Sequence, residues 1–459
     1  MMRASPHPLP KPFLAELRTT VQLGLPLILS LIASMLLGVT DTVMMGWYGV
    51  PELAAVTLGS STFFTIFILG GGFGTAVMGV VAAARARGDD DQLRRATRMA
   101  IWLSVIFAAL ALPVFWASAP ILRALGQSPQ VAGLAQDYLR IMAIGMFAAQ
   151  VSMVLRSYLA AIERTAILLV VTLIGLVVNA ALNWLLIFGH GGFPELGVQG
   201  AAIASVTTQF VMLALQVVYA ARRAESRRVR LFHRLWKPDR AALAEVFRLG
   251  WPIGLTGLSE SGLFQASALM MGWIGTVELA AHGIALQITS LTFMVHVGLS
   301  NAATVRVGRA FGAGDIDRMD RAAWAAIALS LAMVVATAAV FLTVPGQIVG
   351  LFLDRADPAA ARIIAIGSLL LFMSALFQLF DAMQCQALGL LRGVQDTRVP
   401  MWLAGISYWL IGIPAGYLLA FTLNMGPEGL WLGLVIGLAA ASVLLMARFW
   451  RGQARRRAG

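Results

Sequence analysis

Long apolar runs, separated by short charged or Gly/Pro-containing breaks, are the dominant pattern of this chain. About 20 apolar residues are enough for a helix to cross a bilayer. A spanning segment must satisfy its backbone hydrogen bonds internally, and the period-two alternation of a barrel is absent, so the runs are predicted to be helices. The twelve predicted spans are 19–46, 53–80, 99–118, 133–155, 165–189, 199–221, 247–275, 279–304, 322–344, 360–388, 399–420 and 429–448.

Composition supports the same assignment. Of 459 residues, 59% are hydrophobic and 12% are charged, and the mean hydropathy is +0.81. A soluble globular protein carries about 25% charged residues. The predicted fold class is therefore an all-α integral membrane protein with little room for a soluble domain. The single cysteine, Cys385, excludes a disulfide-stabilised secreted domain.

The net charge of +12 could suggest a nucleic-acid partner, but the positions of the basic residues indicate membrane topology instead. With the N-terminus in the cytoplasm, thirty of the 34 Lys and Arg residues fall in segments on the cytoplasmic side. Such a bias predicts that both termini are cytoplasmic and that the basic segments meet anionic lipid headgroups. Arginine is abundant and lysine is rare, which is typical of GC-rich bacterial genomes, so we expect a bacterial plasma membrane. The four remaining basic residues are Arg123, Arg140, Arg355 and Arg362.

The sequence contains an internal repeat. When the chain is aligned with itself without a gap, MMGWYGVPELAA (44–55) falls on MMGWIGTVELAA (270–281), with nine of twelve positions identical. The same register aligns Gly88-Asp89 with Gly314-Asp315. The chain is predicted to be two copies of a six-helix unit, one over 1–235 and the other over 236–459.

Two copies with an even number of spans enter the membrane in the same sense, so an axis along the bilayer normal relates them. Two such lobes would enclose a cleft that alternately opens to each side. This organisation is typical of transporters; a duplicated scaffold without transport is the alternative. Metal-binding Cys/His spacings, Walker loops and G-x-S-x-G elbows are absent from the sequence, so we expect no enzyme activity and no cofactor. An ion gradient is the expected energy source.

Three acidic residues lie inside apolar runs: Asp41, Glu260 and Asp381. Each costs about 2.5–3.5 kcal/mol at a helix centre unless it is paired, hydrated or protonated. The three acids are therefore predicted to bind a proton, a metal cation or a cationic substrate. In the register of the repeat, Asp41 aligns with Ser267 and Glu260 aligns with Ser34, so the two lobes differ in chemistry.

Neighbouring polar residues refine this hypothesis. Asn179 and Asn183 are spaced i, i+4, so they share one helix face and can offer carbonyl oxygens beside Asp41. They could equally well only join neighbouring helices. Glu260 and Asp381 are predicted to share one lobe, where two like charges favour single protonation or cation capture, Na⁺ being a candidate metal. Oxygen ligation suits Na⁺ as well as a proton relay.

Several segments carry a resemblance to a known family. The sequence resembles the multidrug and toxic compound extrusion (MATE) family, in its NorM-like branch, over nearly the whole chain. The segments that carry the resemblance are GVTDTVMMG (38–46), VVNAALNWLLIFG (177–189), GLSESGLFQASALMMGWIGTVELAAHGIALQ (257–287) and LFDAMQCQALGLLRGVQDT (379–397).

The resemblance implies efflux of drugs coupled to Na⁺ or H⁺ entry through two six-helix lobes. It implies an N-lobe polar site at Asp41, Asn179 and Asn183, and a C-lobe cation site at Glu260 and Asp381. Family C-lobe sites often have a tyrosine one turn before the second acid, where this chain has Phe377. This departure leaves the choice between Na⁺ and H⁺ open.

The expected cargo is an amphiphilic, mostly cationic small molecule, handled by a protein that needs no partner subunit. Residues expected to line the cleft are Met271, His282 and Gln287. A flippase for lipid-linked oligosaccharides or precursors is the alternative, but its pyrophosphate cargo would call for arginines in the cleft. A passive channel or a membrane-embedded enzyme is a further alternative.

Overall fold

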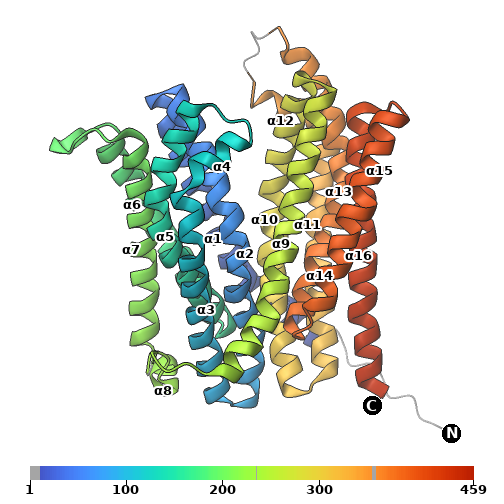
Figure 1. Ribbon diagram of the computed structural model, residues 1–459. Helices are drawn as coiled ribbons and strands as arrows, with labels where there is room; N and C mark the ends of the chain where they lie inside the picture. The colour runs from blue at the N-terminus through green and yellow to red at the C-terminus, as the bar shows by residue number, and fades with distance from the viewer. Residues whose placement is uncertain (1–10, 234, 354–357, 459) are drawn as a thin grey trace. The chain divides into compact units, whose positions relative to one another are not determined.

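The computed structural model describes residues 11–233, 235–353 and 358–458, and all regular secondary structure in these ranges is helical (Figure 1). Most elements are long helices joined by short turns. The predicted all-α fold class is confirmed. The bounds of the helices also follow the apolar runs, because each predicted span overlaps one long helix or one broken helical segment.

Twelve helical segments in the described ranges are long. They are α1 (Lys11–Tyr48), α2 (Val50–Arg87), α3 (Asp90–Trp116), α5 (Pro129–Ala161), α6 (Ala166–Ile187), α7 (Gly197–Arg222), α9 (Arg240–Ile274), α10 (Thr276–Ala313), α11 (Ile316–Thr343), α13 (Ala360–Gly393), the segment from α14 to η3 (Arg398–Thr422) and α16 (Gly426–Ala458). Shorter helices are α4 (Ser118–Ala124), η1 (His190–Gly192), α8 (Ala224–Val229) and α12 (Pro345–Gly350).

Eleven of the long segments are apolar enough to cross a membrane by length and composition. The twelfth is α9, which is 35 residues long and is not among these candidate spans; polar residues, including Glu260, occupy its middle. The eleventh predicted span is the least regular, since α14 (Arg398–Gly405) is followed by the π-helical turns η2 (Ile406–Gly412) and η3 (Leu418–Thr422) around α15 (Ile413–Tyr417).

The repeat is visible in the helix bounds. Helix α10 begins and ends at the positions that the repeat aligns with the two ends of α2, and α11 begins at the position aligned with the start of α3. The turns before α3 and α11 also match: Gly88 and Gly314 both have φ of +71°, and the Asp after each caps the next helix. A left-handed residue is needed to end each helix so abruptly, which is why glycine stands there in both copies.

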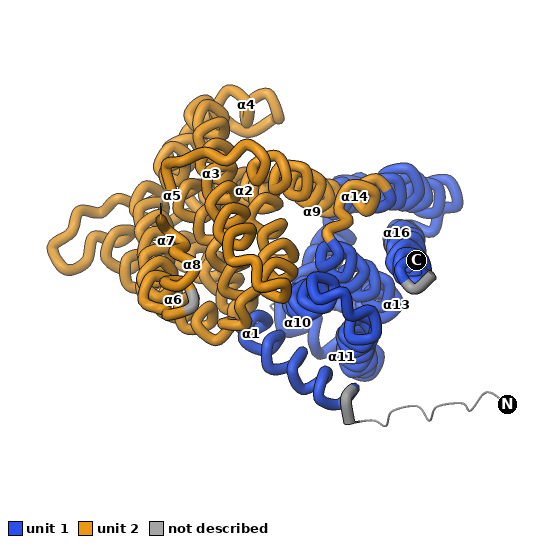
Figure 2. The backbone as a smooth tube through the Cα atoms, turned by 90° about the horizontal axis from the view of Figure 1, so that it is seen from below, with its two compact units in different colours: residues 1–28, 263–394, 403–459 blue, residues 29–262, 395–402 orange. Residues whose placement is uncertain are grey.

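The helices form two compact units (Figure 2). Unit 1 comprises Met1–Ile28, Leu263–Val394 and Leu403–Gly459, and unit 2 comprises Leu29–Gly262 and Gln395–Trp402. The predicted lobes, 1–235 and 236–459, follow the sequence duplication. The compact units are defined by contacts between helices instead. The part of α1 up to Ile28 is therefore grouped with the second sequence copy, and the part of α9 up to Gly262 with the first.

Close helix approaches explain this exchange. In unit 2, a Cβ added to Gly72 of α2 would lie 2.9 Å from the Cα of Gly254 in α9, so the two backbones are nearly in contact. In unit 1, a Cβ added to Gly298 of α10 would lie 3.0 Å from the Cα of Ile28 in α1. Small residues allow such approaches between spanning helices, and they tie each first half-helix to its unit.

Each unit has its own apolar core. In unit 1, fully buried Trp431, Tyr408 and Phe377 are surrounded by aliphatic side chains of α10, α13 and α16. In unit 2, Tyr138 and Phe115 are the large residues of a core formed mainly by α2, α3, α5 and α7. Close packing of these large side chains keeps the polar residues of each unit in fixed positions.

The Gly437–Gly412 contact between α16 and η2 gives a testable packing prediction. A Cβ on Gly437 would lie 2.8 Å from the Cα of Gly412. We expect Gly437→Ala to lower the free energy of unfolding by about 1–3 kcal/mol through overpacking. Gly452, in the same helix, has open space around it. Gly452→Ala is the control and should stabilise by up to ~1 kcal/mol. Thermal unfolding in detergent measures both, and equal shifts would contradict the prediction.

A second prediction concerns the segment before α9. Asp239 accepts a hydrogen bond from the backbone N–H of Ala242 at 3.2 Å and forms an ion pair with Arg95 of α3. The Arg95 guanidinium lowers the pKa of Asp239 from its usual value of 3.8. The stabilisation is therefore present at neutral pH and is lost as the pH falls below that value.

Asp239→Asn keeps the capping oxygen and removes the ion pair, so we expect a loss of less than ~1 kcal/mol at pH 7, because both side chains are partly exposed. Asp239→Ala also removes the cap, which adds about 0.5–2 kcal/mol. Unfolding midpoints measured from pH 7 to pH 3 test this. The difference between wild type and the Asn variant should shrink toward acid pH, and a constant difference would refute the assigned role of the ion pair.

Candidate functional site

Asp41 is the acidic centre of a polar cluster in unit 2. It lies in α1, seven residues before the helix ends at Tyr48, which is roughly 10 Å along the helix axis. Its side chain is half-buried. The Nδ2 of Asn183 donates to Oδ1 of Asp41 at 2.6 Å, and the Oγ of Ser205 donates to Oδ2 at 2.9 Å. Both carboxylate oxygens are therefore held by neutral donors from other helices.

The two asparagines of α6 belong to the same cluster, as predicted from their spacing. Asn183 Nδ2 also donates to Oδ1 of Asn179 at 3.3 Å, and both side chains are buried. Both donors of the Asn183 amide group face acceptors, whereas its own carbonyl oxygen is buried and accepts no hydrogen bond. A buried acceptor without a donor is costly. The cluster therefore presents an unsatisfied oxygen close to a carboxylate, an arrangement that a cation or a proton donor would complete.

Positive side chains do not neutralise this carboxylate. Among the described residues, no Lys, Arg or His forms an ion pair with Asp41. In the described part of the chain, its negative charge is stabilised by neutral groups, the amides of Asn183 and Asn179 and the hydroxyl of Ser205. In a spanning segment such a charge favours binding of a proton or another cation.

Close packing of α6 and α7 brings Ser205 to this cluster. A Cβ on Gly200 of α7 would lie 2.6 Å from the carbonyl carbon of Leu186 in α6. Ser205 follows one to two turns later. Tyr138 of α5 is next to the cluster, with its hydroxyl 3.1 Å from Ser60 Oγ. The sequence did not indicate Ser205 or Tyr138, because a single hydroxyl in an apolar helix is more often a simple packing contact.

Arg156 lies near the end of α5 and contacts α1. It was counted among the cytoplasmic residues, and this assignment stays a prediction. It lies five residues before the helix ends and is half-buried. Its guanidinium donates to Ser30 Oγ at 3.3 Å and to Ser34 Oγ at 3.5 Å. The apolar run ended at the arginine, whereas the helix continues past it, and hydroxyl groups of α1 accept hydrogen bonds from the guanidinium.

Glu260 and Asp381 are placed in different compact units. Glu260 is half-buried on the part of α9 that belongs to unit 2, and Asp381 is 4% exposed on α13 of unit 1. Their predicted sharing of one cation site stays a prediction. Phe377, one turn before Asp381, packs edge-to-face against Phe264 and Trp431 with centroid distances of 6.1 and 5.4 Å. The tyrosine hydroxyl expected at this position is therefore replaced by an apolar contact.

Polar side chains on both sides of Asp381 fix α13 to its neighbours. Thr337 of α11 donates to Gln378 Oε1 at 2.6 Å, and Gln378 in turn donates to Thr292 of α10. Further along α13, Gln386 donates to the carbonyl oxygen of His296 at 3.1 Å. The sequence did not single out these glutamines, although a glutamine inside an apolar run is a signal of interhelical hydrogen bonding.

The three residues expected to line a cleft have different environments. His282 is fully buried, accepts a hydrogen bond from the Trp431 indole N–H at 3.1 Å and lies 3.5 Å from Ser267. Met271 is fully buried in the core of unit 1. Gln287 is exposed. Only Gln287 is accessible within its own unit, so the first two have packing roles in this conformation.

Metal ligation by a cluster of ionisable groups is not seen in the described part of the chain: no group of three or more His, Cys, Asp or Glu side chains could hold an ion there. A sodium site at Glu260 and Asp381 would therefore need neutral oxygen ligands as well. The predicted metal role of these two acids remains untested.

Comparison with known proteins assigns the family. The MatE family model matches residues 26–185 and again residues 252–418, and the repeat aligns the starts of the two matches with each other. Two relatives are probable multidrug resistance proteins NorM. The protein from Rhizobium meliloti (strain 1021) is 45% identical, with 95% of this chain and 93% of the relative covered, and the one from Agrobacterium fabrum (strain C58) is 43% identical, with 95% and 94% covered.

Solved structures agree with the fold. A MATE structure in complex with MaL6 superposes with a TM-score of 0.88 at 21% identity, covering 97% of this chain and 98% of that one. The eukaryotic MATE transporter AtDTX14 gives a TM-score of 0.85 at 22% identity with the same coverage. Because the family model matches both sequence copies and the two NorM relatives align over nearly the whole chain, this chain belongs to the MatE family.

Proposed function

We propose that this protein exports amphiphilic, mostly cationic drugs and toxic compounds, in exchange for Na⁺ or H⁺. The single observation that carries the proposal is the Asp41 cluster: a carboxylate inside a spanning helix, held by neutral donors and close to the unsatisfied Asn183 oxygen. Cargo and coupling ion are both positive, so they can occupy such a site in turn. The multidrug resistance names of the relatives support the same cargo class.

The proposed cycle uses alternating access of the two sequence copies. Cargo binds from the cytoplasm, attracted by Asp41 and by Glu260 or Asp381. After the protein opens outward, an entering cation takes the carboxylates and displaces the cargo. One charge moved inward through 100 mV supplies about 2.3 kcal/mol, equivalent to roughly fiftyfold accumulation of cargo. Cargo and ion compete for one site, and each can favour a different conformation of the protein. This is sufficient to couple export of the cargo to entry of the ion.

The proposed orientation has both termini in the cytoplasm and the protein in the inner membrane of a bacterium. Thirty of the 34 Lys and Arg residues lie in the proposed cytoplasmic segments, and this bias supports the orientation.

The direct test is ethidium accumulation in cells that express the protein. Expressing cells should accumulate less dye than cells with an empty vector, and the difference should disappear when the membrane potential and ion gradients are dissipated. Equal dye retention across several cationic dyes would overturn the proposal. A flippase for anionic lipid-linked cargo would also leave dye accumulation unchanged, so the assay separates the two functions.

A further inference from the structure

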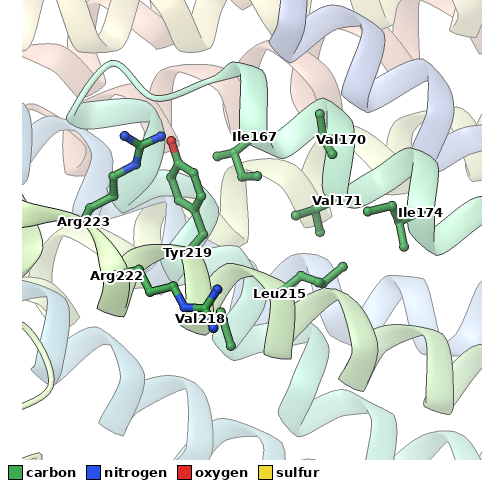
Figure 3. Close-up of a pocket in the computed structure, with 9 residues that line it drawn as sticks. All are labelled: Ile167, Val170, Val171, Ile174, Leu215, Val218, Tyr219, Arg222 and Arg223. Atoms are coloured by element: carbon green, nitrogen blue, oxygen red, sulfur yellow. The ribbon is translucent and has the colours of Figure 1, made fainter.

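A pocket of about 420 Å³ lies between α6 and α7 of unit 2 (Figure 3). It is remote in sequence from Asp41 and is lined from α6 by isoleucine and valine and from α7 by the last two turns of the helix. Both helices are candidate membrane spans. The lining residues are Ile167, Val170, Val171, Ile174, Leu215, Val218, Tyr219, Arg222 and Arg223.

The pocket has an apolar part that faces outward. Val170, Ile174 and Val218 are between 40% and 48% exposed, although they are large aliphatic residues. Exposed apolar residues of a membrane protein mark surfaces that contact lipid, so the recess between the two helices is open to a hydrocarbon chain. Figure 3 shows Val170 and Ile174 at one end of the pocket and the arginines and Tyr219 at the other.

The opposite end is cationic. Arg222 and Arg223 are exposed at the C-terminal end of α7, and the guanidinium of Arg223 lies over the ring of Tyr219, 4.5 Å from its centroid. Neither guanidinium forms an ion pair with a carboxylate in the described part of the chain. The ring fixes one of these two guanidinium groups at the mouth of an apolar pocket. Figure 3 shows the Arg223 guanidinium beside the Tyr219 hydroxyl and that of Arg222 on the other side of the ring, next to Val218. A guanidinium group is a good match for a phosphate.

We propose that this pocket binds one anionic phospholipid of the cytoplasmic leaflet. One of its acyl chains lies between α6 and α7, its phosphate contacts Arg223 beside the Tyr219 hydroxyl, and Arg222 adds a second positive charge near the headgroup. Basic residues next to a spanning helix attract anionic headgroups in general. General attraction of headgroups needs no pocket. Here an apolar recess lies next to the basic residues and can hold an acyl chain of the same lipid molecule, which favours a specific binding site. The leaflet follows from the proposed orientation, but binding itself does not depend on transport.

The test measures lipid binding to the purified full-length protein by native mass spectrometry. The two lipids compared are phosphatidylglycerol and phosphatidylcholine of equal chain length. Wild type should bind phosphatidylglycerol preferentially. The double variant Arg222→Gln/Arg223→Gln should weaken this binding roughly thirtyfold, as expected for two basic groups at a headgroup. Arg451→Gln/Arg455→Gln, which removes two exposed charges from α16 of the other unit, is the matched control and should retain it.

A separate variant tests the apolar part of the pocket. Ile174→Trp fills the pocket without changing the charge, and it should weaken binding of phosphatidylglycerol, whereas Leu110→Trp, on an exposed position of α3, should not. The proposal is overturned if wild type binds both lipids equally, if the two charge variants lose binding equally, or if Ile174→Trp has no effect. Thermal unfolding confirms that the variants are folded. No outcome depends on dye efflux, so a failure here is distinct from a failure of the proposed function.

Discussion

Asp41→Asn is expected to abolish drug extrusion while leaving the protein folded. The amide is nearly the same size as the carboxylate and can still accept from Asn183 or Ser205, so packing is preserved. It can neither attract a cation by charge nor release a proton. Loss of a buried charge partner costs about 2–5 kcal/mol of binding. Ethidium efflux should therefore fall by at least roughly tenfold, to the level of the empty vector.

Two controls make this result specific. Asp89→Asn removes a carboxylate of the same kind from an exposed helix cap, so efflux should be unchanged. Ser205→Ala removes one hydrogen bond and keeps the charge of Asp41, so a partial loss of efflux is expected. Undiminished transport by Asp41→Asn, with the variant present in the membrane at the level of wild type, would remove this acid from the mechanism.

The second large effect is expected at the ion pair between α1 and α10 of unit 1. Arg306 and Glu16 form two hydrogen bonds, at 2.6 and 2.8 Å, and their side chains are 6% and 9% exposed. Arg306→Ala leaves the Glu16 carboxylate buried without this partner. We expect a loss of about 3–5 kcal/mol in the free energy of unfolding, because an uncompensated buried charge is costly. Thermal unfolding in detergent, together with expression level, measures it.

A double variant tests whether the pair itself is responsible. Replacement of both residues by methionine removes both charges and keeps apolar volume, so Glu16→Met/Arg306→Met should be more stable than Arg306→Ala. A double variant that is less stable than Arg306→Ala would show that other contacts of Arg306 dominate. The result also bears on the fold, because this pair helps to hold the first part of α1 in unit 1.

The helices and the duplication could be predicted from the sequence because both depend on local, additive signals. Twelve apolar runs matched twelve long helical segments, and the register of the repeat reappeared in the bounds of α2 and α10. The grouping of Asp41 with Asn179 and Asn183 was also predicted, since the i, i+4 spacing puts the asparagines on one face and the resemblance placed α1 beside it. The structure adds Ser205 and the unsatisfied Asn183 oxygen.

Other features depend on packing that no local pattern encodes. The first parts of α1 and α9 belong to the unit opposite to their sequence copy, and the glycines that allow this, such as Gly72 and Gly254, look like any glycine in a spanning helix. The hydrogen bonds of Arg156 to Ser30 and Ser34 were not predicted, because they join two helices that are far apart in the sequence. Burial of His282 and Met271 could not be predicted, since a hydropathy pattern does not distinguish a cleft from a core.

The most direct test of the central claim is dye transport by purified protein in liposomes under an imposed Na⁺ or pH gradient, each applied alone. One of the two gradients should drive ethidium against its own concentration gradient in wild-type liposomes, and neither should do so with Asp41→Asn. Movement of dye only down its own gradient, or gradient-driven transport undiminished in Asp41→Asn, would contradict cation exchange at this carboxylate.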